Sequence, residues 1–214
     1  GSPAALAALD RGAVDCVWKD RSLGGVDLGR MEQPLRAKLR HWAAQRARPR
    51  IEGTRLARGA SRTRPDLVVV GASTGGPDAV AALLAAAGPL PVPVVLAQHM
   101  PAELGRDCAD HLARRIGRPT ILGTPRLALG PGMTVVLPGG ADGHVLRSSG
   151  GGFSLRIAIG AGVVHPSVDL LLESAAIVAR CAVGVVLTGM GRDGAAGAAR
   201  LAERGMPVLA QSPE

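Results

Sequence analysis

The chain is poor in aromatic side chains: among 214 residues it has one Phe, two Trp and no Tyr. Hydrophobic residues nevertheless make up 47% of the sequence, so a core has to be built from Val, Leu, Ala and Ile. The 30 glycines and 16 prolines fall between apolar runs, which indicates many turns between short elements rather than disorder. At this length we expect one domain of average size with an additional segment.

Cysteines and long apolar runs are also scarce. The three cysteines, Cys16, Cys108 and Cys181, are odd in number, widely spaced and without a C-x-x-C pair. This usage indicates a reducing compartment, with the cysteines as small buried hydrophobic residues. No run approaches the roughly 20 apolar residues that span a bilayer, and no signal-peptide pattern opens the chain. We therefore expect a cytoplasmic location and no direct membrane insertion.

The net positive charge of the chain lies in its first third. Residues 1–65 carry 14 basic and 6 acidic side chains, whereas the rest carries 11 of each. Many of the arginines lie in Arg46–Arg64, among Gly, Ala, Ser, Thr and Pro. A nucleic-acid-binding tail is one interpretation, because arginines neutralise phosphates. No aromatic residue lies among them to stack on bases, so we favour a solvated linker over 46–65 and no nucleic-acid partner.

A glycine-bracketed serine follows the strongest strand pattern. Leu67–Val70 is a short apolar run, rich in β-branched residues, of the kind that fills a central parallel strand. The next five residues, Gly-Ala-Ser-Thr-Gly, fit the nucleophile elbow, in which a sharp strand-to-helix turn exposes a serine hydroxyl, here that of Ser73. Pro77 suits the first turn of the following helix. Glycine-rich turns also bind phosphate at a helix N-terminus, so residues 71–76 leave a nucleotide-binding or phosphate-binding module open.

Two further apolar runs end near polar residues of other catalytic types. Val92–Ala97 is followed by Gln98 and His99, and Val183–Leu187 leads to Asp193 through a glycine-containing segment. In open α/β sheets, ligands bind outside the carboxyl ends of the parallel strands. If all these runs are strands of one sheet, a hydroxyl, an imidazole and a carboxylate meet at one edge. That set is suited to acyl transfer, with the imidazole taking the serine proton and the carboxylate orienting the imidazole.

A second set follows the chain order of ordinary α/β-hydrolases, which runs Ser, then Asp or Glu, then His. It would combine Ser73 with Asp142 and His165. Asp142 lies in the glycine-rich run Pro138–Gly143, which is typical of a turn, and His165 lies just before a helix start at Ser167. Neither residue follows an apolar strand directly. We therefore favour the first set.

Other segments accompany these motifs, and all occur in one order: GASTGGP, QHMP, GPGM, LPGG, PSVD, ESAA and LTGMGRDG. Together they resemble the catalytic domain of the chemotaxis protein-glutamate methylesterase family, from about Asp66 to the last residue. Several spaced motifs in one order are far more specific than any single motif. The resemblance implies a mainly parallel, doubly wound α/β sheet with helices on both faces, similar to a Rossmann-like three-layer sandwich.

The resemblance also implies a role for each site residue. Ser73 would be the nucleophile, His99 the general base and then the general acid, and Asp193 the orienting carboxylate. The backbone N–H groups of Met190 and Thr74 would form the oxyanion hole.

The implied reaction is hydrolysis of glutamate methyl esters on chemoreceptors, with deamidation of receptor glutamines as a second activity. The expected partners are the methylated cytoplasmic helices of the receptors, and the chemistry needs no metal and no organic cofactor. His144 and Arg192 are candidates for contacting the substrate. A non-catalytic receptor adaptor is the remaining alternative.

The segment 1–45 has a pattern of its own. Gly12–Lys19 is typical of a turn into a short strand, and Met31–Trp42 of an amphipathic helix. This resembles the last third of a response-regulator receiver domain, whereas the family normally carries a complete one. The part that would hold the phosphorylated aspartate is absent, so we expect no histidine-kinase phosphorelay for this chain. The catalytic domain, 66–214, also looks short at its C-terminus, with Met206–Ala210 as its last strand.

Overall fold

The computed structural model describes residues 64–160, 164–187 and 192–211, together with five helical residues at positions 32, 35, 36, 39 and 40. These five positions lie within the helix predicted for Met31–Trp42, and Arg36 Nη2 lies 2.7 Å from Glu32 Oε1, one helical turn away. They belong to a different compact unit from the residues that begin at position 64. The receiver-like segment 1–45 and the linker 46–65 otherwise lie outside the described residues and stay predictions.

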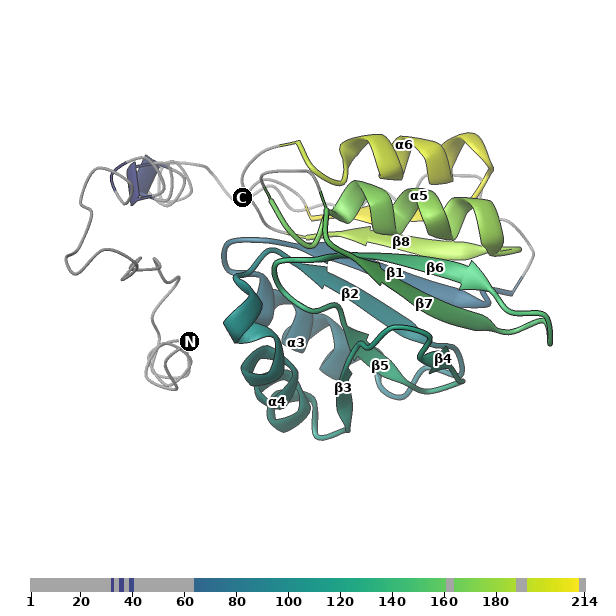
Figure 1. The fold of residues 1–214 in the computed structure, drawn as a ribbon, viewed down its shortest axis with the longest axis horizontal. Coiled ribbons are helices and arrows are strands. Elements are labelled where there is room, and N and C mark those ends of the chain that lie inside the picture. The colour runs from purple at the N-terminus through teal and green to yellow at the C-terminus, as the bar shows by residue number, and fades with distance from the viewer. Residues whose placement is uncertain are drawn as a thin grey trace. The chain divides into compact units, whose positions relative to one another are not determined.

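Six strands form one sheet in the order β3-β5-β2-β1-β8-β9, and every neighbouring pair is parallel (Figure 1). The strands of this sheet are β1 (Leu67–Ala72), β2 (Val94–Gln98), β3 (Thr120–Leu122), β5 (Thr134–Val136), β8 (Ala182–Val186) and β9 (Val208–Ala210). The predicted mainly parallel sheet is confirmed. The apolar runs at Val92–Ala97 and Val183–Leu187 are strands with boundaries shifted by one or two residues, within the usual uncertainty of element ends.

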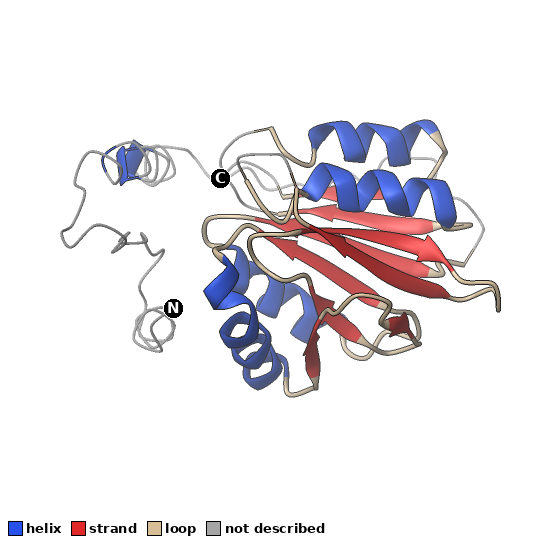
Figure 2. Cartoon of the chain, in the orientation of Figure 1, coloured by secondary structure: helices blue, strands red, loops and turns tan. Residues whose placement is uncertain are grey.

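Helices cover both faces of this sheet, as the sequence predicts (Figure 2). The helices are α3 (Gly76–Ala87), the short 3₁₀ turn η1 (Ala102–Leu104), α4 (Gly105–Ile116), α5 (Val168–Val178) and α6 (Ala195–Glu203). Side chains along β1 alternate between the two faces. Leu67 and Val69 pack in the core beneath α5 and α6, whereas Val70 and Ala72 pack in the core beneath α3 and α4. Both cores are built almost entirely from aliphatic residues.

A second, antiparallel sheet packs against α5 (Figure 1). Its strands are β4 (Ala128–Leu129), β7 (Phe153–Ala158) and β6 (Asp142–Arg147), in that order across the sheet. The turn predicted over Pro138–Gly143 is wrong at its end, because Asp142 is the first residue of β6 and pairs with Ala158. Pairing with a distant strand has overridden the local turn preference of the glycines.

No helix in the described part of the chain has the length and apolar character required to cross a bilayer. Cys108 and Cys181 are buried free thiols, as predicted, and Cys16 lies outside the described ranges.

Candidate active site

The central strand β1 lies between β2 and β8, and the register of these strands brings their carboxyl ends together. Ala72 is opposite Gln98, and the N–H of the next residue, His99, donates to the C=O of Ala72 over 3.0 Å. Ser73 and His99 therefore leave neighbouring strands directly after a registered pair. The predicted meeting of the strand ends is confirmed, and the catalytic roles stay a prediction.

His99 and Asp193 are joined by a short hydrogen bond at this edge. His99 Nε2 lies 2.7 Å from Asp193 Oδ2, and their side chains are 12% and 21% exposed. Since a carboxylate only accepts, the proton of the neutral imidazole is on Nε2 and its lone pair is on Nδ1. The pair therefore presents the basic nitrogen of His99 on the side away from Asp193.

The Asp193 carboxylate lies at the N-terminus of α5. Its Oδ2 accepts a hydrogen bond from the N–H of Val168 (2.7 Å), and its Oδ1 accepts from the N–H of Asp169 (2.9 Å) and the hydroxyl of Ser167 (3.1 Å). Burial alone would raise the pKa of Asp193, but the hydrogen bonds from His99 and from the two backbone N–H groups outweigh it. The pKa of Asp193 is therefore well below its ordinary value. The carboxylate stays ionised and continues to accept from His99.

Asp169 makes the reciprocal contact, from α5 to the beginning of α6. Its Oδ1 accepts hydrogen bonds from the N–H groups of Gly194 (2.9 Å) and Gly197 (2.7 Å). Asp169 of α5 thus accepts hydrogen bonds at the N-terminus of α6, and Asp193, which precedes α6, accepts them at the N-terminus of α5. At both places unpaired N–H groups and the helix dipole favour a negative charge. The exchange fixes the backbone directly after Asp193. The sequence carried no signal for it, because the bonds join residues 25 and 28 positions apart.

Ser73 lies half-buried in the turn between β1 and α3. Its C=O accepts from the N–H of Gly76 and from Gln98 Nε2, each over 2.8 Å. The Gln98 side chain is buried and also donates to the C=O of His99 at 3.2 Å. The side-chain amide of Gln98 thus links the turn at Ser73 to the backbone of His99 through two hydrogen bonds. The Ser73 hydroxyl itself makes no hydrogen bond with His99 or with any other described residue.

Two glycines beside Ser73 are required by close packing. A Cβ at Gly71 would collide with the side chain of Val168, and one at Gly76 would collide with Gln98 Oε1 and Ala72 Cβ. The space next to each glycine is therefore filled by the protein itself. This accounts for the glycine pattern without a bound phosphate, and it disfavours the phosphate-binding alternative.

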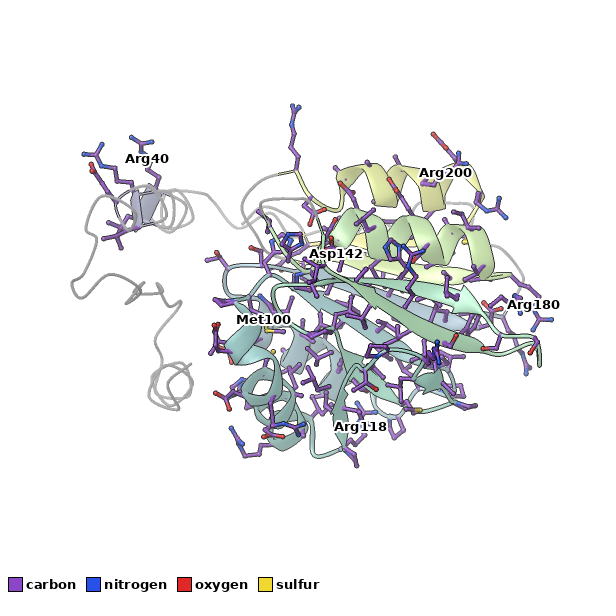
Figure 3. The ribbon with its side chains drawn as sticks, viewed as in Figure 1. Arg40, Met100, Arg118, Asp142, Arg180 and Arg200 are labelled. Carbon is purple, nitrogen blue, oxygen red and sulfur yellow. The ribbon has the colours of Figure 1, made fainter. Side chains whose placement is uncertain are left out.

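The second candidate pair, Asp142 and His165, is also formed. His165 Nδ1 lies 2.9 Å from Asp142 Oδ1, and the same oxygen accepts from the N–H of Ser167 at 2.7 Å. Figure 3 labels Asp142, at the start of β6 and near the beginning of α5. The structure therefore holds two His–Asp pairs, and Ser167 is bonded to the carboxylates of both.

The predicted oxyanion-hole residues are only partly described. Thr74 is buried directly after Ser73, and Met190 lies outside the described residues. Arg192, next to Asp193, is exposed. Within the described ranges no group of three or more His, Cys, Asp or Glu side chains is arranged to hold a metal ion.

His144 lies in β6, half-buried and opposite Arg156 of β7. Burial lowers the pKa of His144, the positive charge of Arg156 lowers it further, and Asp142 and Glu173 partly oppose this.

Comparison with known proteins shows the family of this chain. A family model described as CheB methylesterase matches residues 68–214. The chain belongs to the CheB methylesterase family. In the crystal structure of the Thermotoga maritima CheB methylesterase catalytic domain, the similarity covers 68% of this chain and 79% of that one, with a TM-score of 0.64 and 27% identity.

Curated relatives of the CheB methylesterase family match a shorter stretch. A protein-glutamate methylesterase/protein-glutamine glutaminase 2 of Albidiferax ferrireducens is 43% identical over 90 residues, which are 39% of this chain and 25% of that protein. A protein-glutamate methylesterase/protein-glutamine glutaminase of Chromohalobacter salexigens is 46% identical over 88 residues, 39% of this chain and 24% of the relative. The chain thus spans about a quarter of the length of the curated relatives it matches.

Proposed function

We propose that this chain hydrolyses glutamate methyl esters on chemoreceptors and deamidates receptor glutamines, with Ser73 as the nucleophile. The observation that carries the proposal is the 2.7 Å hydrogen bond between His99 and Asp193, beside the strand that ends at Ser73. The names of the relatives, which combine methylesterase and glutaminase activities, support the same pair of substrates.

In the proposed first half-reaction, Ser73 Oγ attacks the ester carbonyl carbon and passes its proton to His99 Nδ1. Asp193 stabilises the imidazolium that forms, since its carboxylate remains ionised and accepts from Nε2. Backbone N–H groups at Thr74 and Met190 would bind the developing oxyanion, each worth on the order of 3 kcal/mol. The intermediate then collapses, and methoxide leaves as methanol with the proton from His99.

The second half-reaction reverses these roles. A water molecule attacks the glutamyl ester of Ser73 while His99 Nδ1 takes one of its protons. Collapse of the second intermediate returns that proton to Ser73 Oγ and releases the glutamate side chain. With a glutamine substrate the same steps apply, and ammonia replaces methanol as the leaving group.

The proposed substrate also suggests a partner and a compartment. Methylated receptor helices lie in the cytoplasm, so we place the reaction there. The exposed guanidinium of Arg192, beside Asp193, is suited to attracting an acidic receptor segment. His144 is half-buried on the hairpin sheet, and we keep it as a second candidate for substrate contact.

The test is release of methanol from a methylated receptor signalling fragment. We expect Ser73→Ala to lower the rate by several orders of magnitude, as removal of a triad nucleophile does. Ser154→Ala is the matched control, because Ser154 is also half-buried but lies on β7. It should retain the rate of the unmodified chain.

The outcomes separate the alternatives. Equal rates for the unmodified chain and Ser73→Ala would mean that Ser73 is not the nucleophile. Binding of the receptor fragment with no methanol release by either protein would favour the adaptor alternative instead.

A further inference from the structure

Asp142 and His165 have the residue types of a catalytic dyad, yet the proposed mechanism does not use them. Asp142 is 3% exposed, although it is the first residue of a strand. Its Oδ1 accepts from His165 Nδ1 at 2.9 Å and from the N–H of Ser167 at 2.7 Å. A buried carboxylate with two donors on one oxygen fixes the geometry of both donors.

The segment fixed in this way is hydrogen-bonded to Asp193 and to the residue that follows His99. Ser167 and the next two residues supply three of the hydrogen bonds that Asp193 accepts. On the other side, the C=O of His165 accepts from the N–H of Met100, the residue after His99, over 3.1 Å. A shift of this segment would therefore move the carboxylate and the imidazole together.

The packing around the pair leaves it little freedom. A Cβ at Gly160 would collide with Asp142 Oδ2 and would lie 2.5 Å from His165 Cε1, so the chain at the end of β7 closes directly over both side chains. From the other side, Ser167 caps α5 by accepting from the N–H of Leu170 at 3.3 Å. The pair is enclosed between β6, the end of β7 and the start of α5.

We propose that Asp142 and His165 are positioning residues for the reaction: their hydrogen bond fixes residues 165–169, which in turn hold Asp193 and the backbone beside His99. His165 is bonded to its carboxylate through Nδ1, and His99 through Nε2. The effect that we expect on kcat rests on the proposed esterase function, whereas the effect that we expect on the tautomer of His99 does not.

The decisive comparison is between two substitutions of one residue. His165→Ala removes the donor to Asp142. His165→Asn keeps it, because the side-chain NH₂ of Asn lies close to the position of Nδ1, but Asn takes up no proton at neutral pH. For His165→Ala we expect kcat to fall about 100-fold with little change in KM, the effect of a misplacement of about 1 Å. His165→Asn should recover most of the activity and leave the pH profile of kcat/KM unchanged.

A control variant separates positioning from stability. Asp66 also accepts two backbone hydrogen bonds, from the N–H groups of Arg180 and Cys181 at 3.1 Å each, but it lies at the amino end of β1. Asp142→Ala and Asp66→Ala should both lower the urea midpoint. Only Asp142→Ala should lower kcat, and two equal kcat values would overturn the proposal.

Two further results would also overturn it. If His165→Asn is as inactive as Ser73→Ala, and the ionisation in the pH profile disappears, His165 is a proton carrier and not a positioning residue. If His165→Ala keeps full activity, the pair is only structural.

A measurement that does not depend on catalysis distinguishes failure of the positioning proposal from failure of the proposed esterase function. Nitrogen-15 NMR of labelled histidines should show His99 protonated at Nε2 and His165 at Nδ1 in the unmodified chain. In His165→Ala, the single Nε2–H form of His99 should give way to a mixture of tautomers. If this change occurs while no protein releases methanol, the esterase function fails and the positioning role stands. An unchanged His99 signal overturns the positioning role.

Discussion

Asp169→Ala tests the exchange of carboxylates between α5 and α6. The substitution removes the acceptor of two backbone N–H groups, those of Gly194 and Gly197. All other residues of α5 and α6 stay the same. Both glycines are buried, so water does not readily replace the lost oxygen. Asp169→Asn is the matched control, because its carbonyl oxygen still accepts both hydrogen bonds while the negative charge is lost.

The expected magnitudes differ for the two variants. A hydrogen bond to a charged group is worth about 1.5–3 kcal/mol, so losing two of them at the low end of that range costs about 3 kcal/mol in the free energy of unfolding. Losing only the charge at a helix N-terminus costs about 0.3–1 kcal/mol. A domain with the usual stability of about 5–15 kcal/mol remains folded in both cases.

Urea unfolding followed by circular dichroism measures both variants. With an m-value of about 2 kcal/mol/M, the midpoint of Asp169→Ala should fall by about 1.5 M and that of Asp169→Asn by less than about 0.5 M. Equal shifts for Ala and Asn would refute the reasoning, since the loss would then come from charge and not from the acceptor. A midpoint unchanged in both variants would mean that the exchange contributes nothing to stability.

Three further predictions concern charge and pH. In Asp193→Asn one carbonyl oxygen replaces a carboxylate that accepts four hydrogen bonds, so kcat for ester hydrolysis should fall by about 10³–10⁴. Because the pKa of Asp193 is held below its unfolded value of 3.8, its stabilisation is complete above that pH and is lost as the pH falls toward the folded pKa. The difference in urea midpoint between Asp193→Asn and the unmodified chain should therefore be smaller at pH 3 than at pH 6, and a constant difference would contradict this. For His144, burial and Arg156 lower the pKa below 6.5, so the folded state loses stability relative to His144→Gln as the pH falls below that value. Proton NMR should show His144 titrating below pH 6.5 in the folded chain, and a midpoint above 6.5 would contradict the assignment.

The central strands were predictable from local sequence because a parallel strand covered on both faces needs a nearly continuous apolar run. Leu67–Val70 is such a run, and the strand extends from it to Ala72. The residues that follow these runs could be placed at one edge of the sheet, because neighbouring parallel strands end on the same side. Ser73, His99 and Asp193 are therefore candidates from the sequence alone.

The contacts that hold these candidates were not predictable in the same way. Asp142 lies among glycines that favour a turn, and only its pairing with Ala158 of β7 makes it the first residue of a strand. Gln98 could be recognised only as the residue at the end of a strand, and its hydrogen bond to the C=O of Ser73 depends on the turn at Ser73 lying next to it.

The sequence by itself determined the class of the sheet and the three residue types that meet at its carboxyl edge, because both follow from local patterns and from the direction of parallel strands. Tertiary structure alone decided that both His–Asp pairs form and which carboxylate accepts hydrogen bonds at the N-terminus of which helix. Asp193 reaches His99 across 94 positions of the chain, and Asp142 reaches His165 across 23. Hydrogen bonds at such separations depend on how strands and helices pack, and local sequence does not encode that packing.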